Sequence, residues 1–528
     1  MLKKFTILTT SLFALALLVD TTRSLSQTLP DRNKQDPSSQ DQTRLERFEK
    51  QVDDLRTLLK IPGMSAVIIK DQKVSWAKGF GFADLENRIP ATPDTLYHIA
   101  SLTKTFAATL IMQLVEQGKL DLDEPMSHYS SDFKDDSVKI KHLLSHTSEG
   151  TPGEHYQYSG NRYDYLTAVI EKKMGKPFLV VIVETFLDPL GMSSSVPVHN
   201  IVDEADKWAA SLGKEHLDRY RTNLSRLAQP YTLYGNEIIH VPFPPKDSIG
   251  AAAGLLSTVP DMAKYDAAID RHLFLKKETQ EKAWTAFISN DGKRLPHGLG
   301  WFVTDYHGIK LIWHYGHWGT GFSATYLKIP EKNVSLVMLT NSEALSDHQF
   351  QVGKGTIDNG KTIVNNVFAC NFLRLFVFED VQGRSLPDPH WTQDTQKFSS
   401  EVTRLGRQSK GYAYDCERSS QTALARWIEN RRKNVRRSVR LDPKILEAYV
   451  GQYQAEWAPD RILTVSREGD RLFVNIPRND RSELFAESKS KFFLKIRPLQ
   501  MRFIKDKQQV TQMEIVEYGE TLHAKRIQ

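Results

Sequence analysis

Two pairs of short apolar segments, far apart in the sequence, constrain the fold of this chain more than any other feature. Residues 64–69 and 74–77 predict one β-hairpin, and residues 323–328 and 334–339 predict a second. Between them, helical patterns run through Glu116 and again over Tyr163–Met174. Strands at both ends with helices between them favour an antiparallel sheet and disfavour alternating βαβ units. We therefore expect an α/β fold of the α+β type, an antiparallel sheet flanked by helices with an additional helical region.

The length of the sequence and the changes in its composition along the chain indicate more than one domain. The chain has 528 residues, and single hydrophobic cores stop growing near about 250–300 residues. We interpret residues 45–380 as the main domain and the polar segment 381–440 as a helical connector. Short β-type segments in residues 441–528, with a hairpin signature at Glu468-Gly469-Asp470, predict a small all-β domain. The basic run Arg426–Arg440 is typical of a solvated helix face, with contact to an anionic wall or lipid as the alternative.

The N-terminus has the pattern of an export signal. Lys3 and Lys4 precede the apolar stretch Phe5–Val19, which is shorter than the roughly 20 residues that a membrane-spanning helix needs. We expect residues 1–26 to be a signal peptide and residues 27–44 a flexible tether. The mature protein is then periplasmic or secreted, without a stable membrane span. An uncleaved N-terminal anchor is the alternative.

Charge, hydropathy and cysteine content add a few expectations about partners. The formal net charge of +6 is a mild excess, and no nucleic-acid-binding motif is present, so we expect no nucleic-acid partner. The mean hydropathy of −0.43 argues against a polytopic membrane protein. The two cysteines are Cys370 and Cys416. An exported protein can oxidise such a pair, and the sequence leaves a disulfide and two free thiols equally open.

A Ser-x-x-Lys sequence, Ser101-Leu102-Thr103-Lys104, stands at the start of a predicted amphipathic helix. At positions i and i+3 the serine and lysine side chains lie on one helix face, within reach of each other. A serine hydroxyl becomes a good nucleophile when a neighbouring base takes its proton, and lysine can do so when its pKa is lowered. The motif alone is weak, and Ser101 as a simple helix cap is the alternative. Four other Ser-x-x-Lys matches begin at Ser75, Ser131, Ser211 and Ser488.

Further motifs surround this sequence in a fixed order. The segments concerned are Pro62–Val67, Thr95–Lys104, Leu143–Ser148, Asp188–Met192 and Gly254–Thr258. Together they resemble the serine β-lactamase and penicillin-binding-protein superfamily in its class C-like branch, over roughly residues 50–378. The resemblance implies a β-lactamase/transpeptidase-like fold with Ser101 as nucleophile and Lys104 as its base, and it implies no cofactor and no metal.

The second motif of that superfamily is Tyr-x-Asn, and the resemblance places its tyrosine at Tyr158. The implied role of Tyr158 is to relay protons between Ser101, Lys104 and the leaving group, and a core tyrosine is the alternative. Gly160 stands where the motif has asparagine. Asn161 follows one residue late and is the candidate substrate-binding amide.

The third motif, Lys-Thr-Gly or His-x-Gly, matches His314-Tyr315-Gly316. The resemblance implies a strand at the cleft, with Gly316 allowing close backbone approach, and an oxyanion hole formed by the backbone N–H groups of Ser101 and His317. A structural histidine in a strand is the alternative for His314. Because histidine is mostly neutral at pH 7, the motif favours an esterase or aminopeptidase-like hydrolase over a dedicated β-lactamase.

The sequence as a whole predicts an exported serine hydrolase that cleaves an ester or amide bond of a small-molecule or peptide substrate through an acyl-enzyme on Ser101. A β-lactamase or D-alanyl peptidase is the first alternative. A catalytically silent binder of wall peptides is the second, because Gly160 departs from the motif. No Gly-x-Ser-x-Gly elbow, phosphate-binding loop or His-rich metal motif supports another chemistry. The sequence does not indicate the oligomeric state.

Overall fold

A computed structural model describes most of the chain. The described residues are 37–243, 248–319, 321–351, 362–378, 412–433, 435–458, 461–476, 481–497, 499–507, 509–517 and 520–527. The expected signal peptide, residues 1–26, lies outside them. The end of the expected tether, residues 37–44, is helical and belongs to helix α1 (Pro37–Leu58). Among the helices described, none combines the length and apolar character of a membrane span.

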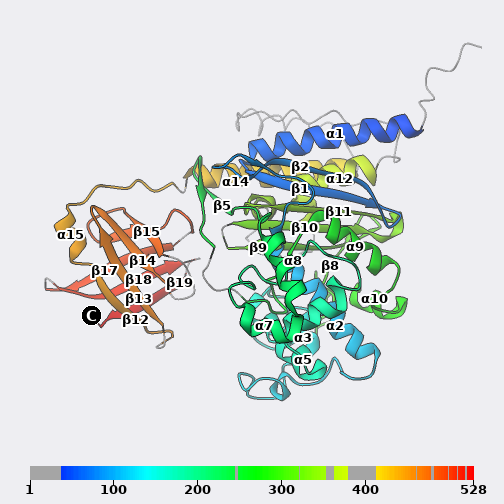
Figure 1. Cartoon of the computed structure of the whole chain (residues 1–528), viewed down its shortest axis with the longest axis horizontal. Coiled ribbons are helices and arrows are strands. Elements are labelled where there is room, and N and C mark those ends of the chain that lie inside the picture. Colours follow the sequence, from blue (N-terminus) through cyan, green and yellow to red (C-terminus); the bar gives the residue numbers. More distant parts are fainter. Residues whose placement is uncertain are drawn as a thin grey trace, which may run out of the picture. The chain divides into compact units, whose positions relative to one another are not determined.

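A seven-stranded antiparallel sheet forms the centre of the main domain (Figure 1). In sheet order its strands are β3 (Ile89–Pro90), β2 (Lys73–Asp84), β1 (Gly63–Lys70), β11 (Val334–Thr340), β10 (Phe322–Ile329), β9 (Ile309–Trp318) and β8 (Phe302–Tyr306). β1 pairs with both β2 and β11, so the two predicted hairpins lie side by side. The apolar run of β1 is buried on both faces, with Ala66 and Ile68 in one core and Val67 and Ile69 in the other. These pairings confirm the predicted antiparallel sheet.

Helices cover both faces of this sheet (Figure 1). Helices α1, α12 (Val367–Phe376) and α14 (Tyr412–Lys433) pack on one face, and α2 (Thr103–Glu116) and α9 (Val259–Asp270) pack on the other. The domain also contains α3 (Ile140–Leu144), α4 (Gly160–Asp164), α5 (Leu166–Met174), α6 (Phe178–Ile182), α7 (Ala205–Leu212), α8 (Lys214–Leu224), α10 (Lys277–Ala283) and α11 (Ala344–Asp347). Two small antiparallel sheets pair β4 (Tyr97–His98) with β7 (Leu256–Ser257) and β5 (Tyr231–Tyr234) with β6 (Glu237–His240).

Helix α14 lies in the segment that the sequence predicts as a connector. Its residues Cys416, Leu424 and Trp427 are buried in the same core as α12. Cys416 forms a disulfide with Cys370 of α12, with the two Cα atoms 5.8 Å apart. The predicted helical character is therefore present, but this helix belongs to the core of the main domain. The apolar residues of α14 lie within a polar and basic segment, so composition alone conceals their packing.

The C-terminal domain is a closed, antiparallel eight-stranded barrel, preceded by helix α15 (Pro443–Glu447). Its strands are β12 (Gly451–Ala455), β13 (Ile462–Glu468), β14 (Arg471–Asn475), β15 (Arg481–Ala486), β16 (Lys491–Phe493), β17 (Leu499–Asp506), β18 (Gln509–Glu517) and β19 (Glu520–Arg526). The predicted hairpin joins β13 to β14 through Gly469, whose φ of +59° suits glycine. Pairing of β12 with β19 closes the barrel, and apolar side chains fill its interior. The predicted small all-β domain is thus confirmed.

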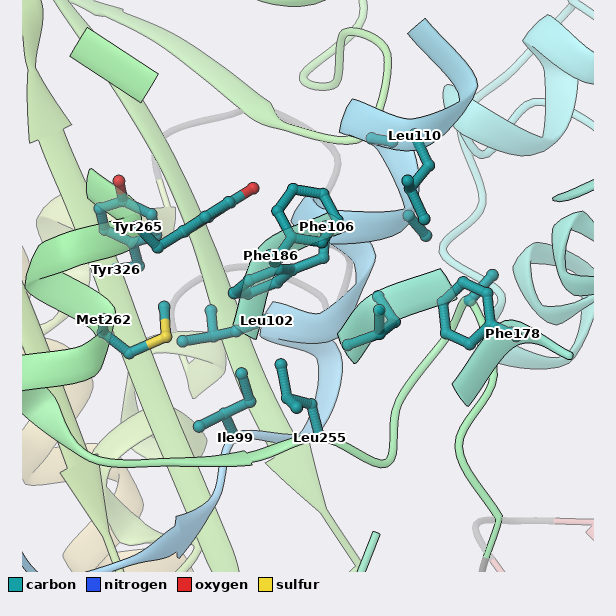
Figure 2. Packing of buried hydrophobic residues seen from close by; sticks show 14 of the residues in the cluster. Ile99, Leu102, Phe106, Leu110, Phe178, Phe186, Leu255, Met262, Tyr265 and Tyr326 are labelled. Carbon is teal, nitrogen blue, oxygen red and sulfur yellow. The ribbon is translucent and has the colours of Figure 1, made fainter. Parts of the chain in front are cut away.

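An aromatic core fixes helix α2 in the main domain (Figure 2). The ring of Phe106 stacks on Tyr265 with centroids 3.9 Å apart and meets Phe186 edge-on at 5.2 Å. Ile99 and Leu102, at the start of the helix, are fully buried in the same cluster. Burial of each such large side chain contributes about 1.5–3 kcal/mol. The residues at the start of α2 are therefore held by a rigid apolar support.

We expect Phe106→Ala to lower the free energy of unfolding by about 3–5 kcal/mol, because the substitution removes a buried ring and leaves a cavity between α2 and α9. Urea denaturation followed by circular dichroism measures this loss. Phe106→Leu, which keeps most of the apolar volume, should lose clearly less. Equal losses in the two variants would contradict the stacking argument.

Candidate active site

Ser101 lies in a short 3-10 turn, Ala100–Leu102, that leads directly into α2. Ala100 has a φ of +50°, an uncommon backbone conformation for a residue other than glycine. Two hydrogen bonds hold the turn: the Ala100 N–H donates to His98 Nδ1 at 3.0 Å, and the Thr103 hydroxyl donates to the Ala100 carbonyl at 2.7 Å. This strained turn leaves Ser101 half-buried at the N-terminal end of α2.

The amine of Lys104 lies beside the Ser101 hydroxyl. Lys104 Nζ is 3.0 Å from Ser101 Oγ, and it also donates to the carbonyl of Ala252 at 2.8 Å. The side chain is only 1% exposed. Burial lowers the pKa of Lys104 to about 7, against the carboxylate of Asp164, which raises it. At neutral pH a large fraction of the amine is therefore unprotonated and able to accept a proton from Ser101.

The Ala252 carbonyl is positioned by a loop that begins at Gly250. Asp164 Oδ1 accepts a hydrogen bond from the Ala252 N–H at 3.1 Å. A Cβ atom at position 250 would lie 2.2 Å from the same carboxylate oxygen, so this approach requires glycine. Sequence reasoning missed Asp164, because nothing in its local pattern distinguishes it. It also missed Ala252, for which the run of small residues after Gly250 was the available signal.

Tyr158 lies in the segment just before α4, beside Lys104. Lys104 Nζ is 5.3 Å from the centroid of the Tyr158 ring. Burial raises the pKa of Tyr158, an effect that the neighbouring Ser101 and Tyr315 hydroxyls oppose. The phenol is therefore protonated at neutral pH. Its buried oxygen faces the Ser101 and Tyr315 hydroxyls, so the phenol is placed to pass a proton to or from Ser101.

The end of strand β9 approaches the Ser101 turn. β9 pairs with β8 only as far as Trp313, so residues 314–318 have one edge without that neighbour. A Cβ atom at Gly316 would lie 2.3 Å from the carbonyl oxygen of Ile99, two residues before Ser101. Glycine is thus required for the strand to pass so close to the turn.

His314 is fully buried on this strand and is neutral. Its Nδ1 lies 2.7 Å from the carbonyl oxygen of Tyr315, to which it donates. Burial lowers the pKa of His314 well below its usual value, and the neighbouring His297 and Lys104 lower it further. His314 therefore supplies no fixed positive charge that would attract a substrate carboxylate.

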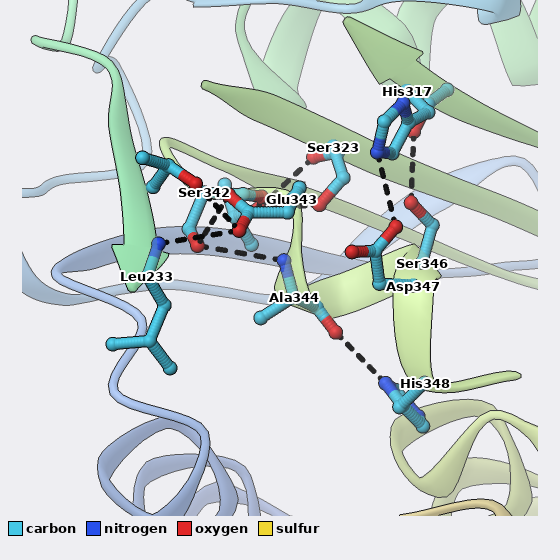
Figure 3. Close-up of polar contacts among 12 residues, drawn as sticks. Leu233, His317, Ser323, Ser342, Glu343, Ala344, Ser346, Asp347 and His348 are labelled. Carbon is cyan, nitrogen blue, oxygen red and sulfur yellow. Dashed lines mark hydrogen bonds and ion pairs between the residues drawn. The ribbon is translucent and has the colours of Figure 1, made fainter. Parts of the chain in front are cut away.

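The side chain of His317 makes contacts of a different kind (Figure 3). Its Nε2 lies 3.0 Å from Asp347, and Arg431 of α14 contacts both Asp347, at 3.5 Å, and the buried Glu343. Burial lowers the pKa of His317, but the charge and hydrogen bond of Asp347 outweigh it and the pKa is raised. The His317 side chain thus anchors the end of β9 to α11 and α14, and its backbone N–H remains the candidate oxyanion donor.

Asn161 is exposed on α4, and no described hydrogen bond links it to Ser101, Lys104 or Tyr158. A Cβ atom at Gly160 would meet no atom within 4 Å. The space at Gly160 therefore does not exclude an asparagine. What the departure from the motif changes is the loss of a side-chain amide at this position.

Two further aromatic residues contact the site. The Tyr163 ring centroid lies 5.3 Å from Lys104 Nζ, and the Tyr163 hydroxyl donates to the backbone carbonyl of Lys104 at 3.1 Å. The ring of His146 lies 4.3 Å from that of Tyr158. Sequence reasoning placed His146 in the family segment Leu143–Ser148 and assigned it no role. In the described part of the chain, no group of His, Cys, Asp or Glu is arranged to hold a metal ion.

Comparison with protein families gives two matches. Residues 48–351, more than half of the chain, match the family model described as Beta-lactamase. Residues 435–526, which include the barrel, match a domain of unknown function, DUF3471.

Individual proteins are similar at lower identity. The chain is 22% identical over 467 residues to Penicillin-binding protein 4* of Bacillus subtilis (strain 168), covering 80% of this chain and 86% of that protein. It is 29% identical over 170 residues to Protein flp of Staphylococcus aureus (strain NCTC 8325 / PS 47), which covers 25% of this chain and 34% of that protein. Among solved structures, the octameric penicillin-binding protein homologue from Pyrococcus abyssi has a TM-score of 0.48 and 21% identity, covering 93% of this chain and 100% of that chain.

We expect Gly316→Ala to slow covalent labelling of Ser101 by a fluorophosphonate roughly 100-fold, because the new methyl group forces β9 away from the turn that carries Ser101. Intact mass spectrometry over time measures the labelling. Thermal unfolding of the same preparation checks that the variant is folded. A folded Gly316→Ala protein that labels at the wild-type rate would show that this close approach is not needed.

Proposed function

This chain belongs to the β-lactamase family, whose members are serine hydrolases, and on that premise we propose that it hydrolyses an ester or amide substrate through an acyl-enzyme on Ser101. Lys104 is the general base, Tyr158 the proton relay, and the backbone N–H groups of Ser101 and His317 form the oxyanion hole. The substrate is a small molecule or a peptide.

The observation that carries the proposal is the contact between Lys104 and Ser101. A serine hydroxyl needs a base within hydrogen-bond distance, and Lys104 Nζ is 3.0 Å from it. An ordinary lysine is protonated at neutral pH and cannot act as that base. Burial lowers the pKa of this amine to about 7, which matches the value that a general base needs.

In the acylation step, unprotonated Lys104 takes the proton of Ser101 as Oγ forms a bond with the substrate carbonyl carbon. The carbonyl electrons move to its oxygen, which the two backbone N–H groups stabilise. When the tetrahedral intermediate collapses, the bond to the leaving alcohol or amine breaks. The Tyr158 hydroxyl donates a proton to that leaving group and regains one from the Lys104 ammonium.

In the deacylation step, a water molecule attacks the acyl carbonyl, and Lys104, which is again unprotonated, accepts the proton of the water. The bond between Oγ and the acyl carbon then breaks, the proton returns to Ser101, and the acid leaves. Because the pKa of Tyr158 is raised, the phenol serves in this step as a donor and acceptor between neighbours, and not as a resident anionic base.

A β-lactamase or D-alanyl peptidase is the second candidate. The similarity to a relative named as a penicillin-binding protein, over 80% of the chain, favours it. The neutral state of His314 favours the ester or amide hydrolase without a carboxylate requirement. Comparison of nitrocefin with short-chain nitrophenyl esters as substrates separates these two candidates.

We also propose that the protein is exported to the periplasm or secreted. The positively charged start and apolar stretch of residues 1–26 support this location. The Cys370–Cys416 disulfide is a second support, since such bonds persist mainly in oxidising compartments.

We expect a fluorophosphonate to form one stable adduct with the wild-type protein and none with Ser101→Ala, because only an activated serine displaces the leaving group of the probe. Intact mass before and after incubation measures the adduct. Ser211→Ala, which changes the serine of another Ser-x-x-Lys sequence, serves as the control and should label normally. Absence of an adduct on folded wild-type protein would instead favour a silent binder of wall peptides.

We expect the labelling rate to rise with pH, with its midpoint near 7, because raising the pH through the pKa of Lys104 converts the ammonium into the amine that accepts the Ser101 proton. The second-order rate constant of labelling, measured across that range, gives the midpoint. In Lys104→Met, which keeps the apolar stem, labelling should be slow and show no such midpoint. A midpoint retained in that variant would assign it to another group.

A further inference from the structure

His146 forms hydrogen bonds with the backbone on both sides of Tyr158. Its carbonyl oxygen accepts a hydrogen bond from the Gln157 N–H at 2.8 Å, and its ring Nδ1 accepts one from the Ser159 N–H at 3.2 Å. Between these two contacts, the His146 ring lies 4.3 Å from the Tyr158 ring. A single residue thus fixes both chain neighbours of Tyr158 and the ring itself.

The same ring also reaches the second aromatic neighbour of Lys104. His146 lies 5.2 Å from the Tyr163 ring, and both Tyr158 and Tyr163 have their ring centroids 5.3 Å from Lys104 Nζ. The two tyrosines that border the buried amine therefore pack against one histidine.

The backbone of His146 is itself in an unusual conformation. Its φ is +54°, in the left-handed region that residues other than glycine adopt infrequently. Its side chain is 2% exposed. Such local strain persists where the surrounding contacts determine the conformation, and it is typical of functional sites. The strained backbone lets the carbonyl and the ring of one residue point toward the same neighbouring segment.

We propose that His146 is the positioning residue that holds Tyr158 in place for proton transfer, acting through its Nδ1 acceptor and its ring face. This inference rests on the proposed function, because it assigns a role within that reaction. His146 contacts neither Ser101 nor Lys104 directly in the described structure, and it acts through Tyr158.

The hydrogen bond to Ser159 requires that Nδ1 carry no proton, so the neutral ring carries its proton on Nε2. The surroundings favour that neutral state. Burial lowers the pKa of His146 well below its usual value, and the charges of His297, Lys104 and His314 lower it further. The acceptor is therefore present throughout the neutral pH range.

Substitutions at position 146 separate this role from that of an ordinary core histidine. Asparagine places an oxygen near the position of Nδ1 and tolerates a positive φ, so His146→Asn preserves the acceptor for the Ser159 N–H. His146→Phe preserves the ring and removes the acceptor. His146→Gln is a polar variant whose amide lies further out, near the position of Nε2.

His142 provides a matched control four residues earlier. It is 7% exposed, and its Nδ1 accepts the Lys139 N–H at 3.0 Å, so it uses the same kind of bond. None of its described contacts involves Tyr158 or Lys104. His142→Asn and His142→Phe should therefore affect the melting temperature without affecting Ser101.

The experiment measures the maximal rate of fluorophosphonate labelling and the probe concentration at half that rate, for each full-length variant, together with its melting temperature. We expect His146→Asn to label within a few-fold of wild type and His146→Phe to lose roughly 100-fold in the maximal rate, with little change in the half-saturating concentration. If His146→Phe does not fold, His146→Gln replaces it, and the same loss is expected.

The outcomes separate this inference from the proposed function. Wild-type protein that does not label refutes the proposed function and this inference together. Normal labelling of wild type together with normal labelling of the folded Phe or Gln variant overturns the inference alone. An equal loss in the Asn variant, or a similar loss in the His142 variants, also overturns it, since the effect would then not depend on the Nδ1 acceptor.

Discussion

The removal of the Lys104 amine from water is the constraint around which the main domain is organised. The decrease in its pKa from 10.5 to about 7 makes protonation roughly 5 kcal/mol less favourable than in solution. The surrounding groups keep the amine usable despite that penalty: the Ser101 hydroxyl and the Ala252 carbonyl accept its hydrogen bonds, and two tyrosine rings cover it. The core beneath α2 holds the lysine in position relative to these groups, because Phe106 fixes the helix that carries it.

Strand β9 separates two different electrostatic environments. On the side of His314, burial keeps the histidine rings neutral, so the lysine has no permanent cation beside it among the residues whose contacts are described. On the side of His317, charges are present but paired: His317 lies beside Asp347 (Figure 3), and Arg431 pairs with Asp347 and Glu343. Paired charges contribute little field at a distance, while they hold the strand in place. The amine can thus remain partly unprotonated close to an ionic network.

Local spacing explains what the sequence predicted, and long-range packing explains what it missed. Ser101 and Lys104 are three residues apart, so one helical turn is enough to bring them together, and the two hairpins of short apolar segments specify the antiparallel sheet. Asp164 and Ala252 come from distant segments and meet Lys104 only in the folded domain. Helix α14 was expected to be a connector because the apolar residues that pack against α12 are interspersed with charged residues in its sequence. Such contacts have no sequence period, so pattern reasoning does not detect them.

The arrangement of the site also bears on substrate choice. A lysine at the position of His314 would present a permanent cation, whereas the buried, neutral histidine does not. In the described part of the chain, the cation beside Ser101 is Lys104, whose charge must be lost for the proposed reaction to begin. A substrate carboxylate that stabilised the Lys104 ammonium would therefore raise its pKa and oppose the first proton transfer. In the proposed reaction, the buried amine that activates Ser101 thus favours substrates without a negative charge near the scissile bond.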